Sequence, residues 1–200
     1  MFFGGRGGVT ALPGDYTVKI KYEGEEASGT FTVAPDPRFK ADLAVLIANH
    51  DLAVEARKLS AALTSAQQQI QAAQKAIQTV RDYGRANRGP KMMDIMKAAD
   101  ELDKKLKGLA EAINPTPAKQ GMADRSSGLM SQVMGGVSGL SRAGYDPVSQ
   151  AAKVRYEKAK VKLAEFLPKF NEVFEKDVEA FKVLLKEAGF SLFDPFKPLR

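Results

Sequence analysis

The chain has 200 residues, of which 44% are hydrophobic and 27% charged, a composition typical of folded globular proteins. It has no cysteine and one histidine, His50, which excludes disulfides, thiolate chemistry and metal sites built on cysteine or histidine clusters. The formal net charge of +6 favours anionic partners only weakly. No apolar run is long enough to span a membrane, and the first residues lack the apolar core of a secretory signal.

Two short segments near the N-terminus predict β-strands. Apolar and polar residues alternate over residues 16–22, and again over residues 29–33. The charged turn 23–26 joins them, and the proline-rich segment 34–37 ends the second strand. A lone two-stranded hairpin is marginal in water. We therefore expect it to pack on helices, to pair with another chain, or to be the end of a larger sheet.

Residues 41–80 predict the longest helix. Apolar residues recur there at alternating spacings of three and four, which keeps one narrow seam facing partner helices. Asn49 interrupts the seam and is interpreted as a residue that fixes register. The seam positions are Val45, Asn49, Leu52, Ala56, Leu59, Leu63, Ala66, Ile70, Ala73, Ile77 and Val80.

Three further helices are predicted. One spans residues 91–113, between a Gly-Pro turn and an Asn-Pro-Thr-Pro segment. A short, glycine-containing helix spans residues 126–142, in which Gly135 and Gly139 have the spacing of a close-packing motif.

The last predicted helix spans residues 147–188. Asp146 is its expected N-cap, Pro168 is expected to kink it, and Gly189 is the expected residue after its C-cap.

The sequence thus predicts a mainly α fold, an antiparallel bundle of two long and two short helices with an N-terminal β-hairpin. Residues 1–36 form the hairpin domain and residues 37–200 the bundle. From the matched lengths we expect the first and last helices to run antiparallel, which leaves a two-helix end for the hairpin and the aromatic C-terminal tail to cover. The expected interaction residues gather there: Tyr16, Val18, Ile20, Phe31, Val33, Phe181 and Phe193.

Three segments resemble the C-terminal region of bacterial sortilin-like β-propeller proteins with Asp-box repeats, often labelled glycosyl hydrolases. They are residues 12–20, which contain the run Pro-Gly-Asp-Tyr-Thr-Val, the Val-Ala-Pro-Asp-Pro-Arg exit at 33–38, and residues 181–189, which end in Leu-Leu-Lys-Glu-Ala-Gly. In that family the first run belongs to the last strands of an immunoglobulin-like sandwich that follows the propellers. The exit then leads into a helical tail.

The resemblance implies an accessory region of a larger exported protein, periplasmic or secreted, whose partners are upstream propeller and immunoglobulin-like domains. No Asp-box and no tryptophan occur in this chain, so no hydrolytic residue is carried over. We therefore expect a non-catalytic module for docking, spacing or assembly, with no cofactor and no metal. Acidic residues around the hairpin turn are interpreted as solvated charges, because a turn offers no cleft between two carboxylates.

A basic cluster at the end of the first helix supports an alternative. A self-standing helical protein could bind an anionic partner through Arg81, Arg85, Arg88 and Lys91. That partner would be a nucleic acid or an anionic surface. Nucleic acid is the less expected of the two, because acidic residues interleave with the other basic clusters and no aromatic residues are placed to stack on bases. His50 has no second histidine or cysteine to act with and is interpreted as structural.

Overall fold

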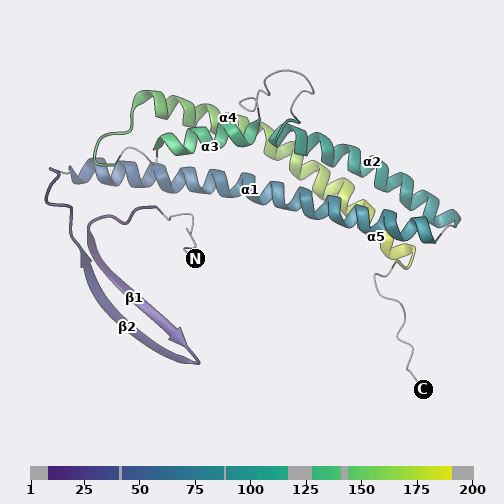
Figure 1. Ribbon diagram of the computed structural model, residues 1–200, viewed down its shortest axis with the longest axis horizontal. Helices are drawn as coiled ribbons and strands as arrows, with labels where there is room; N and C mark the ends of the chain where they lie inside the picture. The colour runs from purple at the N-terminus through teal and green to yellow at the C-terminus, as the bar shows by residue number, and fades with distance from the viewer. Residues whose placement is uncertain (1–8, 41, 88, 117–127, 141–143, 191–200) are drawn as a thin grey trace. The chain divides into compact units, whose positions relative to one another are not determined.

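A computed structural model describes residues 9–40, 42–87, 89–116, 128–140 and 144–190. In this part the chain is mainly helical, with one antiparallel β-hairpin before the helices (Figure 1), as the sequence predicted. The chain divides into two compact units, one of Met1–Ala62 with Gln132–Val161 and the other of Leu63–Ser131 with Lys162–Arg200.

Strands β1 (Gly14–Tyr22) and β2 (Glu25–Val33) form the hairpin, in unbroken register from the Tyr22–Glu25 pair to the Gly14–Val33 pair. The two loop residues, Glu23 and Gly24, have φ angles of 48° and 89°. Positive φ at both positions is the type I′ turn, whose twist matches that of the strands. Glycine takes this conformation without steric cost, which explains Gly24.

Helix α1 (Leu43–Ala86) is continuous and longer than predicted at its C-terminal end. Asp42 caps its start, accepting a hydrogen bond from the Ala44 N–H at 2.9 Å. The predicted seam is confirmed: its residues from Ala56 to Val80 are buried or half-buried, and its residues Val45 and Leu52, nearer the start of the helix, are half-buried.

Helix α2 (Pro90–Ile113) begins with proline at its first position, where the missing N–H has no helical partner to lose. Helix α3 (Leu129–Leu140) lies within the range predicted for the short helix. The last helical stretch consists of α4 (Gln150–Glu172), a π-helical segment η1 (Val173–Val178) and α5 (Glu179–Glu187). Helix α4 continues through Pro168, and the π-helical geometry begins five residues later.

The ends of this last helical stretch test two capping predictions. Asp146 is not the N-cap: α4 begins at Gln150, and the Ala152 N–H donates to the Ser149 hydroxyl at 3.3 Å. Gly189 is the expected residue after the C-cap, with φ 68°, and its N–H donates to the Lys186 carbonyl. The Phe190 N–H donates to the Leu185 carbonyl, which completes a Schellman motif.

In the unit of residues 1–62 and 132–161, α3 packs closely and antiparallel on α4. A Cβ added to Gly136 would lie 3.1 Å from the Ala159 Cβ, and one added to Gly139 would lie 3.2 Å from the Ala152 Cβ. Glycine is therefore needed at positions 136 and 139, whereas Gly135 has open space around it. The close-packing prediction holds for α3, but the pair is Gly136 and Gly139. A core cluster joins α1, α3 and α4: Ala56, Leu140, Val148, Ala152 and Tyr156, with Leu52, Leu59 and Val137 packed against it.

In the unit of residues 63–131 and 162–200, α2 runs antiparallel to α1 and to the end of the last helical stretch. Arg81 of α1 pairs with Asp100 and Asp103, while Gly84, further along α1, lies against Met92 and Met96. The buried side chains of this unit include Leu63, Ile70, Ile77, Ile95, Leu106, Ile113, Leu163, Phe166 and Phe170.

The direction of the last helical stretch corrects one prediction. In the unit of residues 1–62 and 132–161, the Asn49 side-chain amide of α1 donates a hydrogen bond to the Asp146 carbonyl, and the Tyr156 hydroxyl of α4 donates to Glu55 of α1. The later residue of α1 therefore contacts the later residue of the last helical stretch. These helices run parallel, not antiparallel. Matched lengths alone do not distinguish a parallel from an antiparallel pair. In this chain α2 runs antiparallel to α1, and α3 runs antiparallel to α4, so the chain reverses direction twice between the two long helices. The two-helix end expected at the start of α1 does not form, because α3 and α4 share a core with the first half of α1.

Candidate functional site

The hairpin has one apolar and one polar face. Cross-strand partners share a face, so the Tyr16–Phe31, Val18–Gly29 and Ile20–Ala27 pairs lie on one side. The Asp15–Thr32, Thr17–Thr30, Lys19–Ser28 and Lys21–Glu26 pairs lie on the other. Such an amphipathic ribbon has one side suited to water and one suited to a protein partner.

The apolar face is open to solvent. Val18 is 49% exposed, Ile20 62%, Phe31 51% and Tyr22 73%. The prediction that these side chains pack on the helices is therefore wrong. Its physical basis was the two-helix end, which does not form, since α3 and α4 share a core with the first half of α1.

Local interactions hold the base of the hairpin. The Tyr16 and Phe31 rings stack with centroids 5.8 Å apart, and the Tyr16 hydroxyl donates to the Leu12 carbonyl at 2.7 Å. On the polar face, the Thr32 hydroxyl donates to Asp15 at 2.6 Å. Tyr16 takes part in two of these contacts and is half-buried, whereas the residues of β1 nearer the turn are exposed.

The two other predicted interaction residues lie elsewhere. Phe181 is in α5 and is 7% exposed, so its side chain belongs to the core of its unit. Phe193 lies outside the described residues. Among the predicted interaction residues that the structure describes, the exposed ones are Val18, Ile20 and Phe31 of the hairpin.

Of the basic residues at the end of α1 that the structure describes, Arg81 and Arg85 are paired with carboxylates. Arg81 is bound by Asp100 at 2.6 Å and by Asp103 at 3.0 Å, and Arg85 pairs with Asp82 at 3.1 Å. Arg88 lies outside the described residues, and Lys91 lines the cavity described below. Among the described residues of this set, two of the three cations therefore already have carboxylate partners.

Asp103 is the centre of a charged cluster that the sequence reading missed. It is 5% exposed and accepts hydrogen bonds from Arg81 and from Lys107, the latter at 2.8 Å. Burial alone would raise the pKa of Asp103, but the hydrogen bonds from Lys107 and Arg81 outweigh it and hold the pKa below 3.8. The spacing of four residues between Asp103 and Lys107 in a predicted helix is the sequence pattern that indicates this ion pair. No sequence pattern indicates the pair with Arg81, because Arg81 comes from another helix.

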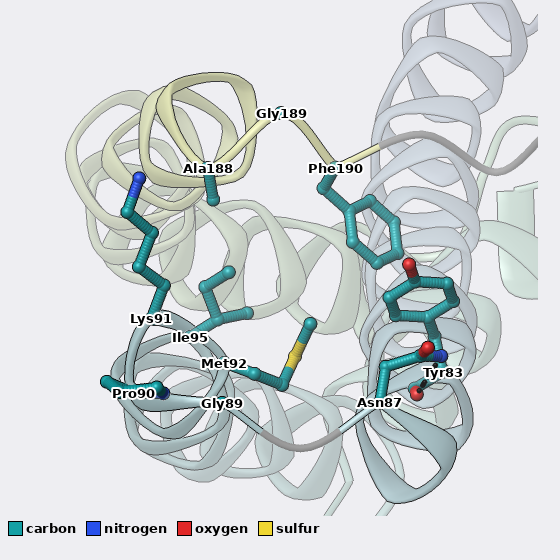
Figure 2. A pocket seen from close by; sticks show the side chains of 10 residues that line it. All are labelled: Tyr83, Asn87, Gly89, Pro90, Lys91, Met92, Ile95, Ala188, Gly189 and Phe190. Carbon is teal, nitrogen blue, oxygen red and sulfur yellow. Dashed lines mark hydrogen bonds between the residues drawn. The ribbon is translucent and has the colours of Figure 1, made fainter.

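An open cavity of about 430 Å³ lies where the ends of α1 and α5 meet the start of α2. Figure 2 shows the side chains that line it. The rings of Tyr83 and Phe190 meet edge to face on one wall, with centroids 5.0 Å apart. Met92 and Ile95 form the floor, and Lys91 stands on the far side. The Asn87 side-chain amide is already engaged, donating to the Tyr83 carbonyl. The polar groups among the lining residues do not converge on one point, so the cavity indicates no particular class of ligand.

Over the described ranges, no group of three or more His, Asp or Glu side chains is placed to hold a metal ion. His50 contacts Asp51 at 3.4 Å. No helix in the part of the chain that the structure describes is long and apolar enough to cross a membrane. The fold and its exposed face define a helical bundle that carries an amphipathic β-hairpin. No known protein family matches the sequence, and neither the curated proteins nor the solved structures contain a match.

Proposed function

We propose that this chain is a non-catalytic interaction module that docks through the apolar face of its hairpin. The observation that carries the proposal is the exposure by about half or more of Val18, Ile20, Tyr22 and Phe31 on one face. Burying an aliphatic or aromatic side chain stabilises a complex by about 1.5–3 kcal/mol in transfer free energy. Exposed apolar side chains gathered on one face mark interaction sites in soluble proteins.

The resemblance to sortilin-like β-propeller proteins supports a specific setting for this contact. The Pro-Gly-Asp-Tyr-Thr-Val run that carries the resemblance contributes the start of β1. In the related region this run belongs to an immunoglobulin-like sandwich, whose strands are covered on one face by a second sheet. We propose that the chain is the C-terminal region of a larger exported protein and that an upstream domain covers the apolar face.

Two observations test this proposal. The reading frame upstream of Met1 should continue through Asp-box repeats to a signal peptide. In the longer protein, hydrogen exchange at the backbone amides of β1 and β2 should be slower than in the 200-residue chain alone. An in-frame stop codon directly upstream, or equal exchange in both proteins, would overturn the proposal.

Matched variants locate the contact. Replacing Ile20 and Tyr22 by serine should abolish the added protection, because both side chains lie on the apolar face. Replacing Lys19 and Lys21 by serine changes the same strand on its polar face and should leave the protection intact. Equal effects of both double variants would argue against docking through the apolar face.

A further inference from the structure

The hairpin also has two free edges, and they differ in chemistry. The strands are joined by a two-residue turn, so Tyr22 and Glu25 form a hydrogen-bonded pair. From there, non-hydrogen-bonded and hydrogen-bonded pairs alternate along the strands, and the backbone groups of the non-hydrogen-bonded pairs point outward. On β1, the residues whose backbone groups point outward are Asp15, Thr17, Lys19 and Lys21. On β2 they are Glu26, Ser28, Thr30 and Thr32.

Charged side chains guard the edge of β1 but not most of β2. Lys19 and Lys21 are 64% and 76% exposed, although both contact Glu26. Two copies of β1 paired side by side about Lys19 would place like charges opposite one another, which is destabilising. A pair about Thr17 would place Lys19 opposite Asp15, but it would also place Lys21 opposite Pro13, which has no N–H to donate to the second strand. From Ala27 to Val33, β2 carries no charge, no proline and no bulge, the features that natural edge strands use to avoid pairing.

The β2 sequence is complementary to itself about Thr30. In an antiparallel pair of two β2 strands related by a two-fold axis at Thr30, Ser28 lies opposite Thr32 of the second copy. Gly29 lies opposite Phe31, so the smallest side chain faces the largest, twice. Glu26 lies opposite Ala34, so no like charges meet. Self-complementarity of this kind is what a two-fold interface requires.

Among the described residues, neither a close neighbour nor the backbone conformation requires glycine at position 29. Its φ is not in the left-handed region, and a Cβ there would meet nothing within 4 Å. Glycine inside a strand weakens it and often marks a close approach by another group. A phenylalanine ring from a neighbouring strand covers such a glycine in paired sheets.

We propose that β2 pairs antiparallel with β2 of a second copy of this chain, centred on Thr30. The result is a four-stranded sheet whose two apolar faces lie on the same side, which exceeds the roughly three strands that a stable sheet needs. This inference rests on the proposed function, since it makes the docking face twice as wide, but it names a different contact.

The absence of cysteine allows a direct test in the full chain. Opposed residues of a hydrogen-bonded antiparallel pair have Cα atoms about 5.5 Å apart, within the range that a disulfide spans. Thr30→Cys should therefore form a disulfide-linked dimer under mild oxidation. Thr17→Cys, at the cross-strand position on the guarded edge, is the matched control and should stay largely monomeric. Cross-linking of Thr17→Cys equal to or faster than that of Thr30→Cys would overturn the proposal.

Sedimentation velocity over a range of concentrations gives an independent measurement. The unmodified chain should show a monomer–dimer equilibrium. Thr30→Pro removes an outward-pointing N–H from each copy and should raise the dissociation constant about tenfold or more. Thr17→Pro removes the equivalent group from the other edge and should leave the constant unchanged. Far-UV circular dichroism checks that both variants remain folded.

The outcomes separate the two proposals. A chain that stays monomeric at every concentration overturns the pairing of β2. If hairpin amides are nevertheless protected in the longer protein, docking through the apolar face stands and only the second copy fails. If the chain dimerises and the cross-link forms at Thr30, but no upstream domain protects the hairpin, the pairing stands and the proposed docking fails.

Discussion

Asp103 is the buried charged residue among those that the structure describes. Its carboxylate is stabilised by Arg81 and Lys107, so its ionised form belongs to the folded state. Removing one partner of a buried ion pair is costly because the other charge loses its compensation. Here the cost is moderated by Asp100, which also binds Arg81.

We expect Asp103→Asn to lower the free energy of unfolding by about 1.5–3 kcal/mol at pH 7, the range for a hydrogen bond to a charged group. Asp100→Asn is the control and should cost under about 1 kcal/mol, because the Asp100 side chain is 59% exposed. Urea unfolding followed by circular dichroism measures both changes. Equal losses would contradict the central role of Asp103.

The pH dependence of this difference has a definite sign. The pKa of Asp103 is lower in the folded chain than its usual 3.8, so the unfolded state binds the proton more readily. The contribution is present above pH 3.8 and is lost as the pH falls through the folded-state value. The gap between the unmodified chain and Asp103→Asn should therefore narrow as the pH falls below 3.8. A gap as large there as at pH 7 would show that the charge is not its origin.

At the scale of the element, α3 shows how closely a helix can approach when glycine allows it. Gly136 lies against the Ala159 side chain and the backbone of α4, so any side chain there must push the helices apart. Gly135, one residue earlier, faces open space and only costs helix propensity.

Two substitutions separate these roles. Gly136→Val should destabilise the chain by about 1–3 kcal/mol through overpacking against α4. Gly135→Ala should stabilise it by about 0.5–1 kcal/mol, because alanine favours the helix and meets no neighbour. Thermal unfolding compares the two. A stabilising Gly136→Val would mean that α3 and α4 do not pack as described.

Each element also shows how far the sequence predicts the fold. The heptad seam of α1 identified its buried face, since apolar spacing is a local property of the chain. Helix direction was predicted wrongly because matched lengths do not distinguish parallel from antiparallel neighbours. Asn49 was recognised as a seam residue, but its partners, the carbonyls of Gly144 and Asp146, are nearly a hundred residues away. The hairpin and its face were predictable; its exposure depended on helix packing, which was not.

At the scale of the whole molecule, the hairpin contributes little apolar burial to the chain, because the large side chains between its base and its turn are exposed. The segment after it makes specific contacts with other parts of its unit. Phe39 stacks on Tyr145 with ring centroids 4.5 Å apart, and the Asp42 carboxylate caps α1. Both residues lie within the predicted bundle domain, residues 37–200.

We therefore expect residues 37–200 to fold without the hairpin. The truncated chain should keep the helical circular dichroism of the full chain and unfold within a few degrees of its midpoint, since a shift of about 1 kcal/mol moves the midpoint of a domain this size by about 2–4 °C. Truncation to residues 43–200 removes both Phe39 and the Asp42 cap, and should lower the midpoint further. If loss of residues 1–36 alone abolished cooperative unfolding, the hairpin would be part of the core and its apolar face could not be reserved for a partner.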